Sequence, residues 1–139
     1  HAEVLRQEPE TTLIFRGPDA YISPTWYDHE NVPTWDYAIV HVRGIAVPID
    51  DPGDKESHVL ALIQQMEPTL KVRGEFVRQY LEEIRAFQLI SFEVEPVFKL
   101  SLDKSDESVR GVCAGLRSRD TWLDEETAQL IEQLQSATR

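Results

Sequence analysis

Cysteine is almost absent from this sequence of 139 residues, which contains Cys113 alone. A single cysteine excludes a disulfide within the chain and any paired-cysteine metal motif, and it is typical of a reducing compartment. Long apolar runs are missing as well, because no stretch approaches the roughly 20 residues that a membrane-spanning helix requires. We therefore expect a cytoplasmic protein that does not span a membrane.

Basic residues are scarce. The chain has 14 Lys and Arg against 25 Asp and Glu, which gives a formal net charge of −11. A surface of this sign repels phosphate backbones, so direct binding to nucleic acid requires a strong local basic patch. The nearest candidate patch, which acidic residues interrupt, consists of Lys104, Arg110, Arg117 and Arg119. We regard direct binding to nucleic acid as doubtful.

The sequence also lacks the motifs of common catalytic and metal sites. Ser23 lies between Ile22 and Pro24 rather than between the glycines of a nucleophile elbow. The four histidines share no ligand spacing, and no glycine pattern for binding nucleotide phosphates is present. The residues by themselves therefore favour a role without catalysis, although they do not decide it.

Aromatic residues, by contrast, are concentrated in one segment. Residues 15–37 hold six of the twelve aromatic residues and three of the eight prolines. Tyr and Trp offer wide, rigid surfaces that suit stacking on a flat ring system, and prolines reduce the entropy lost when a site is ordered. Two interpretations stay open: a rigid loop that closes the fold, or the wall of a site for a flat ligand.

Hydrophobic periodicity predicts an α+β protein with a barrel-like antiparallel sheet. In chain order the expected elements are strands over residues 11–15, 20–23 and 35–49, helices over 50–68 and 74–85, a strand over 88–103, and helices over 105–116 and 124–136. Four strands do not close a barrel, so we expect further strands upstream of His1. We treat residues 1–139 as one domain, with 105–139 as its C-terminal helical segment.

The same patterns predict which side chains are buried. Residues 35–49 are apolar on both faces, so we expect this strand to be covered on each side. In the strand 88–103 one parity should be buried, namely Ile90, Phe92, Val94, Phe98, Leu100 and Leu102, with Pro96 marking a bend or an edge. In the helix 105–116 we expect Val109, Val112, Cys113 and Leu116 to face inward, while Gly111 and Gly115 permit close packing against a neighbour.

Two phrases, "FRGPDAYISPTWY" and "VPTWDYAIVHVRG" within residues 15–44, resemble the signature of the PaiB-type family of FMN-binding negative transcriptional regulators. The resemblance continues more loosely through residues 84–117, which end in "KLSLDKSDESVRGVCAGLR". It implies an FMN-binding split β-barrel with flanking helices, of the pyridoxamine-phosphate-oxidase-like kind and partial in this chain. It also implies a homodimer with FMN between the subunits, and a role in repressing protease production and sporulation.

The resemblance and side-chain chemistry together give ten candidate cofactor-binding residues: Tyr21, Ser23, Trp26, Tyr27, Trp35, Tyr37, His41, Lys99, Ser101 and Arg117. Asp36 stands where the family usually has Asn, and "KLSLD" replaces Lys-Leu-Ser-Gln-Asn. The added charge of Asp36 and Asp103 is expected to weaken binding of the anionic FMN phosphate. Two alternatives remain: a flavin-dependent oxidoreductase of the pyridoxamine-phosphate-oxidase or flavin-reductase type, and a dimeric interaction module without a cofactor.

Overall fold

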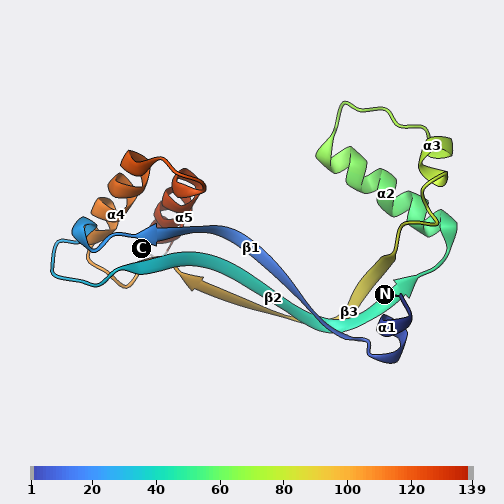
Figure 1. Cartoon of the computed structure of the whole chain (residues 1–139), viewed down its shortest axis with the longest axis horizontal. Coiled ribbons are helices and arrows are strands. Elements are labelled where there is room, and N and C mark those ends of the chain that lie inside the picture. The colour runs from blue at the N-terminus through green and yellow to red at the C-terminus, as the bar shows by residue number, and fades with distance from the viewer. Residues whose placement is uncertain (1, 138–139) are drawn as a thin grey trace. The chain divides into compact units, whose positions relative to one another are not determined.

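The computed structural model describes residues 2–137 and confirms the α+β class (Figure 1). Three strands form an antiparallel sheet in the order β1-β2-β3, and this sheet stays open, as in a partial split barrel. In chain order the elements are α1 (Ala2–Gln7), β1 (Glu10–Ile22), the 3₁₀ helix η1 (Pro24–Trp26), β2 (Thr34–Ile49), α2 (Pro52–Met66), α3 (Gly74–Arg78), β3 (Ala86–Lys99), α4 (Asp106–Arg119) and α5 (Asp124–Ala137).

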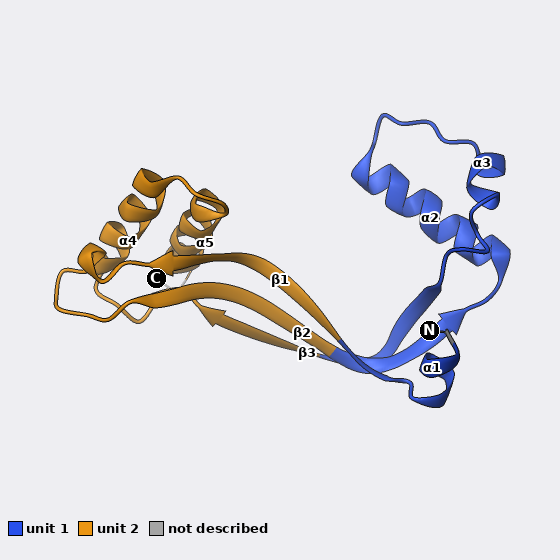
Figure 2. Ribbon diagram, viewed as in Figure 1, with its two compact units in different colours: residues 1–12, 43–93 blue, residues 13–42, 94–139 orange. Residues whose placement is uncertain are grey.

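The chain divides into two compact units (Figure 2). Unit 1 contains residues 1–12 and 43–93, and unit 2 contains residues 13–42 and 94–139. Each of the three strands is therefore shared between the units. All ten candidate cofactor-binding residues belong to unit 2, so this unit is described in most detail.

Unit 2 has a core formed by α4, α5 and the C-terminal end of β1. Helix α4 begins where expected, because the Ser105 hydroxyl accepts a hydrogen bond from the amide of Ser108. Its apolar stripe is buried as predicted. The buried core residues are Ala20, Ile22, Leu100, Val109, Val112, Cys113, Leu116, Ala128 and Ile131, with Trp26, Tyr27, Leu130 and Leu134 packed against them.

Unit 1 contains few buried side chains. Helix α2 begins as predicted, with Asp51 accepting a hydrogen bond from the amide of Asp54, and Pro52 follows that cap. Arg78 of α3 bonds the Glu56 carboxylate of α2 at 2.8 Å. Among the described residues of unit 1, the buried hydrophobic side chains are those of Ala46, Val77 and Leu81.

The prediction of two short strands over residues 11–15 and 20–23 is wrong, because β1 runs without interruption from Glu10 to Ile22. Two strands were expected because Gly17 and Pro18, read alone, are typical of a turn. Pro18 fits an edge strand, since its missing N–H is not required on the open side of β1. Gly17 lies against β2 so closely that an added Cβ would be 3.2 Å from the Cβ of Ala38.

Burial of the strands also differs from the prediction. Strand β2 spans nearly the predicted residues, yet it is not covered on both faces, because the side chain of Trp35 is 51% exposed. Strand β3 ends at Lys99 rather than residue 103, and Ser101, just beyond that end, adopts a left-handed φ of 55°. Of the expected buried face of β3, only Leu100 is buried; the exposed members are Ile90, Phe92, Val94, Phe98 and Leu102. No element among residues 2–137 covers them.

The helix predicted over residues 74–85 is shorter in the structure. Helix α3 ends at Arg78, and the following turns are closed by hydrogen bonds between residues three apart, including Tyr80 to Val77 at 3.0 Å. Phe76 and Tyr80 remain exposed and meet edge to face. The two C-terminal helices, in contrast, match their predicted positions within three residues at each end.

Candidate functional site

Unit 2 contains a cleft of about 450 Å³ between the loop after η1 and the adjoining ends of β2 and β3. Its volume falls within the range of small-molecule sites, and its lining mixes apolar walls with hydroxyl, amide and charged groups. The lining residues are Tyr27, Asn31, Val32, Thr34, Asp36, Phe98, Lys99, Leu100, Ser101, Leu102, Asp103 and Lys104. Three of the ten candidate residues therefore meet here: Tyr27, Lys99 and Ser101.

The floor of this cleft includes a buried carboxylate. Asp36 alternates along β2 with the exposed Trp35 and is itself only 1% exposed. The Ser101 hydroxyl donates to Oδ2 of Asp36 at 2.7 Å, and the Tyr27 hydroxyl lies 3.3 Å from the Ser101 hydroxyl. Oδ1 of Asp36 is buried without a hydrogen-bond partner. Burial raises the pKa of this carboxyl above its ordinary value, and the bond from Ser101 offsets only part of that effect.

Two lysines add positive charge to the cleft. The Lys99 ammonium donates to two neutral oxygens, the Thr34 hydroxyl and the Trp35 carbonyl, the latter at 3.0 Å. Lys104 instead pairs with the Asp103 carboxylate at 2.5 Å, and this bond lowers the pKa of Asp103. Lys99 is therefore better placed than Lys104 to receive an anionic group of a ligand, because the oxygens that accept its hydrogen bonds are neutral.

A carboxylate that the sequence did not single out fixes one wall of the cleft. Asp28 accepts hydrogen bonds from the hydroxyls of Ser105 at 2.7 Å and Ser108 at 2.5 Å, and its other contact is the His29 ring at 2.6 Å. These bonds, led by that from Ser105, lower the pKa of Asp28. The loop that follows Tyr27 is thus attached to the N-terminus of α4. Asp28 and Ser105 are 77 residues apart in the chain, so no local pattern in the sequence indicates this contact.

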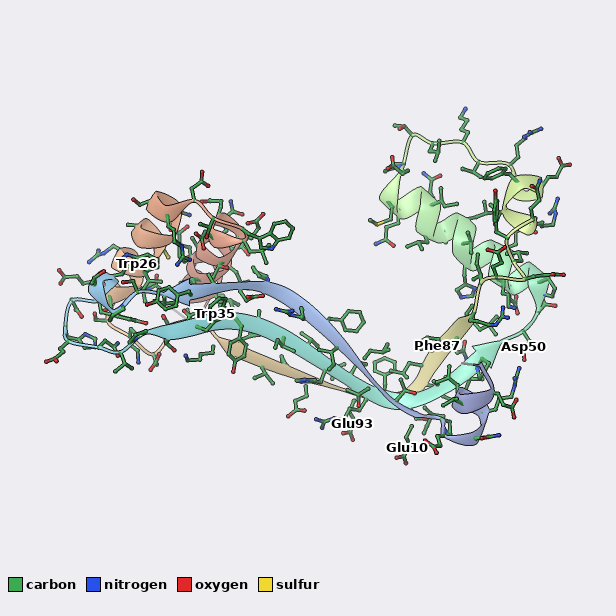
Figure 3. All side chains as sticks on the ribbon, viewed as in Figure 1. Glu10, Trp26, Trp35, Asp50, Phe87 and Glu93 are labelled. Carbon is green, nitrogen blue, oxygen red and sulfur yellow. The ribbon has the colours of Figure 1, made fainter. Side chains whose placement is uncertain are left out.

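A second group of candidate residues, Tyr21, Trp35 and Tyr37, forms an aromatic surface of unit 2 that we call the exposed aromatic surface. The rings of Tyr21 and Trp35 meet edge to face with centroids 6.2 Å apart, and the Trp35 indole donates to Asp19 at 2.9 Å. Figure 3 labels Trp35 on β2. Trp35 and Tyr37 line a cleft of about 180 Å³. Trp122, which is 86% exposed, lines a neighbouring cleft of about 300 Å³ together with Tyr21 and Trp35. Trp122 is not among the ten candidate residues, because in the sequence it is an isolated ring between two predicted helices.

The remaining candidate residues lie elsewhere in unit 2. Trp26 packs over Gly115 of α4, and the Ser23 hydroxyl accepts a hydrogen bond from the amide of Thr25 at the start of η1. Arg117 pairs with Glu132 and Glu125 of α5, and these bonds raise its pKa. His41 is half-buried on β2, and its Nδ1 has no hydrogen-bond partner. These four residues do not line the 450 Å³ cleft.

Residues 2–137 contain no group of three or more His, Cys, Asp and Glu side chains that could hold a metal ion. None of the helices in this range is long and apolar enough to cross a bilayer.

The chain matches a family model described as "Putative FMN-binding domain" over residues 1–92. It is 28% identical over 129 residues to "Protease synthase and sporulation protein PAI 2" of Bacillus subtilis, an alignment that covers 88% of this chain and 62% of that protein. It is 36% identical over 87 residues to "Uncharacterized protein YKL070W" of Saccharomyces cerevisiae, covering 59% of this chain and 52% of that protein. The chain thus spans roughly half to three fifths of the length of these relatives.

Proposed function

This chain belongs to the FMN-binding domain family whose model it matches, and on that premise we propose that it binds FMN and acts, as a homodimer, in gene regulation. The related Bacillus protein is named for protease synthesis and sporulation, and we extend that kind of role to this chain. The observation that carries the proposal is the 450 Å³ cleft of unit 2, with its apolar walls and the ammonium of Lys99, whose hydrogen-bond acceptors are neutral oxygens.

The residues of this cleft fit the chemistry of FMN. A flavin offers a flat ring with acceptors and one N–H along its edge, and a phosphate at the end of its ribityl chain. Phe98, Leu100 and Leu102 supply apolar contact, and the hydroxyls of Tyr27 and Ser101 supply hydrogen bonds. Lys99 supplies a cation for the phosphate. When bound, FMN contributes a redox-active ring, while the protein binds and orients it and excludes water from it.

The exposed aromatic surface supports the homodimer. Tyr21 is 38% exposed and Trp35 is 51% exposed. Rings of this kind are enriched in the centres of protein interfaces, where they become desolvated. We propose that a second copy covers this surface and that Tyr21, Trp35 and Tyr37 thereby border the flavin at the boundary between subunits.

Titration of the chain with FMN, followed by quenching of flavin fluorescence, tests the proposal. Lys99→Met should weaken FMN binding by roughly tenfold or more, because a charge-assisted hydrogen bond contributes about 1.5–3 kcal/mol. Lys71→Met, which removes an exposed lysine of unit 1, is the matched control and should leave the affinity unchanged. Equal affinities of the two variants would contradict the assignment of the cleft.

Sedimentation of wild type and Trp35→Glu tests the dimer, since a carboxylate placed within an apolar interface should yield monomers. A dimer that persists while FMN fails to bind would instead support the interaction module without a cofactor. Steady turnover of NADPH with FMN supplied would support the oxidoreductase.

The regulatory role is proposed to operate without direct contact to DNA, because the formal charge of −11 opposes it. A gel shift that shows sequence-specific, salt-sensitive binding would contradict this part of the proposal.

A further inference from the structure

We propose that Asp36 determines which ligands the 450 Å³ cleft accepts: as a buried negative charge it disfavours ligands that carry a phosphate, and protonation of its carboxyl removes that penalty. This inference rests on the proposed function, because it concerns the same cleft. It goes further by assigning to one residue the selectivity between charged and uncharged flavins, and by making that selectivity depend on pH.

The geometry isolates the Asp36 carboxylate from solvent. The residue is 1% exposed, Oδ2 accepts one hydrogen bond from Ser101, and Oδ1 accepts none. A carboxylate in such surroundings is stabilised by few dipoles, and its field is weakly screened by water. Asp36 therefore acts on a bound ligand through its charge, without requiring direct contact between the ligand and Oδ1.

The charged groups around Asp36 offset its negative charge only in part, since burial still holds the pKa of its carboxyl above the ordinary value. From the end of β3, the Lys99 ammonium lowers the pKa of Asp36, and beyond β3 Lys104 does the same while Asp103 raises it. From α4, the nearby Cys113 thiol has a pKa raised to about 11 by burial and so stays neutral near pH 7. An anionic ligand at Lys99 must therefore share that cation's field with Asp36.

The sign of the pH dependence follows from linkage. An anion bound in the cleft disfavours the ionised form of Asp36, so binding raises the pKa of this carboxyl further. A ligand that raises a pKa binds more tightly when the group is protonated. As the pH falls through the raised pKa of Asp36, the affinity of wild type for a phosphate ligand should therefore rise. The rise is measured relative to a variant that has a neutral residue at position 36.

Asp103 provides a matched control in the same cleft. It also lines the cleft and carries the same charge, but its side chain is 75% exposed and is paired with Lys104 at 2.5 Å. Water and the paired ammonium both screen its field. Removing the charge of Asp103 should therefore change ligand affinity much less than removing the charge of Asp36.

The experiment measures the affinities of wild type, Asp36→Asn and Asp103→Asn for FMN, riboflavin and inorganic phosphate between about pH 4, near the ordinary pKa of an aspartate, and about pH 8. Riboflavin has the same ring without the phosphate, and inorganic phosphate tests the charge alone. The Asn amide keeps an acceptor for the Ser101 hydroxyl, which should preserve the fold. Asp36→Ser serves as a second neutral variant. The phosphate itself titrates near pH 6, which changes the affinity of every variant. The comparison therefore uses the ratio of each variant's affinity to that of wild type at the same pH.

Near pH 7.5, Asp36→Asn should bind FMN on the order of tenfold more tightly than wild type, as expected for one charge about 10 Å away at an effective dielectric of about 20. Its affinity for riboflavin should change less than about twofold, and Asp103→Asn should change FMN affinity less than about threefold. The advantage of Asp36→Asn should shrink as the pH falls.

An equal gain for riboflavin and FMN, or a gain independent of pH, would overturn the inference while leaving FMN binding intact. If neither flavin binds, the proposed function fails, and inorganic phosphate then decides the inference. Tighter phosphate binding by Asp36→Asn, measured through the amide resonances of Ser101 and Leu102, would support it. Equal binding, or no binding by any variant, would overturn it.

Discussion

We expect Gly115→Ala to destabilise the wild-type chain but to stabilise a variant that lacks the Trp26 side chain. An added Cβ at Gly115 would overlap the Trp26 indole and lie 2.6 Å from its Cγ. At Gly111, one turn earlier on α4, an added Cβ would instead overlap the backbone carbonyl oxygen of Trp26. The two glycines therefore leave room for different parts of the same residue.

The magnitude follows from two opposing contributions. Gly→Ala in a helix interior stabilises by about 0.5–1 kcal/mol, because alanine loses less conformational entropy. Overpacking a close contact costs about 1–3 kcal/mol, because the indole is rigid and must shift. Gly115→Ala should thus destabilise wild type by up to about 2 kcal/mol and should stabilise the Trp26→Ala background by about 0.5–1 kcal/mol. Gly111→Ala should destabilise both backgrounds, since Trp26→Ala leaves the carbonyl in place.

A double-mutant cycle measures the coupling by urea denaturation, with the slope of each transition compared to verify that the unfolded states are alike. The expected coupling between Trp26 and Gly115 is about 1–3 kcal/mol. Stabilisation of wild type by Gly115→Ala, or a coupling near zero, would refute the packing described for η1 and α4. If Trp26→Ala removed the loss of stability caused by Gly111→Ala, Gly111 would be packed against the Trp26 ring and not against its backbone carbonyl, contrary to the structure.

Two further predictions concern titratable groups of unit 2. Burial raises the pKa of the Cys113 thiol to about 11, so Cys113 in the folded chain should react with a thiol reagent at pH 8 at least about tenfold more slowly than in denaturant; equal rates would show that it is accessible. Asp124 has its pKa lowered to about 2, first by the bond from Arg119, so the stability it contributes is complete above about pH 4 and is lost as the pH falls towards 2. Asp124→Asn should therefore flatten the acid limb of a plot of unfolding free energy against pH, and an unchanged acid limb would contradict this role.

The amino-acid sequence by itself determined the elements whose signals are local. Helices α4 and α5 follow from their apolar periodicity, and α2 follows from Asp51 and Pro52 at its start. The long strand β2 follows from a run of β-branched and aromatic residues. The phrases within residues 15–44 pointed to the family that the comparisons confirm. Each of these signals lies within a few residues of the feature it predicts.

Only the tertiary structure decided the features that depend on distant residues. Gly17 and Pro18 became part of β1 because that strand lies at an edge of the sheet, whereas the same residues indicate a turn when read alone. The burial of Asp36 depends on Ser101, 65 residues away, whose left-handed backbone places its hydroxyl beside the carboxylate. Local propensity favours one element for each segment, but where an element is interrupted, which side chains are buried and which charges pair all depend on contacts between segments, and those contacts arise only when the chain folds.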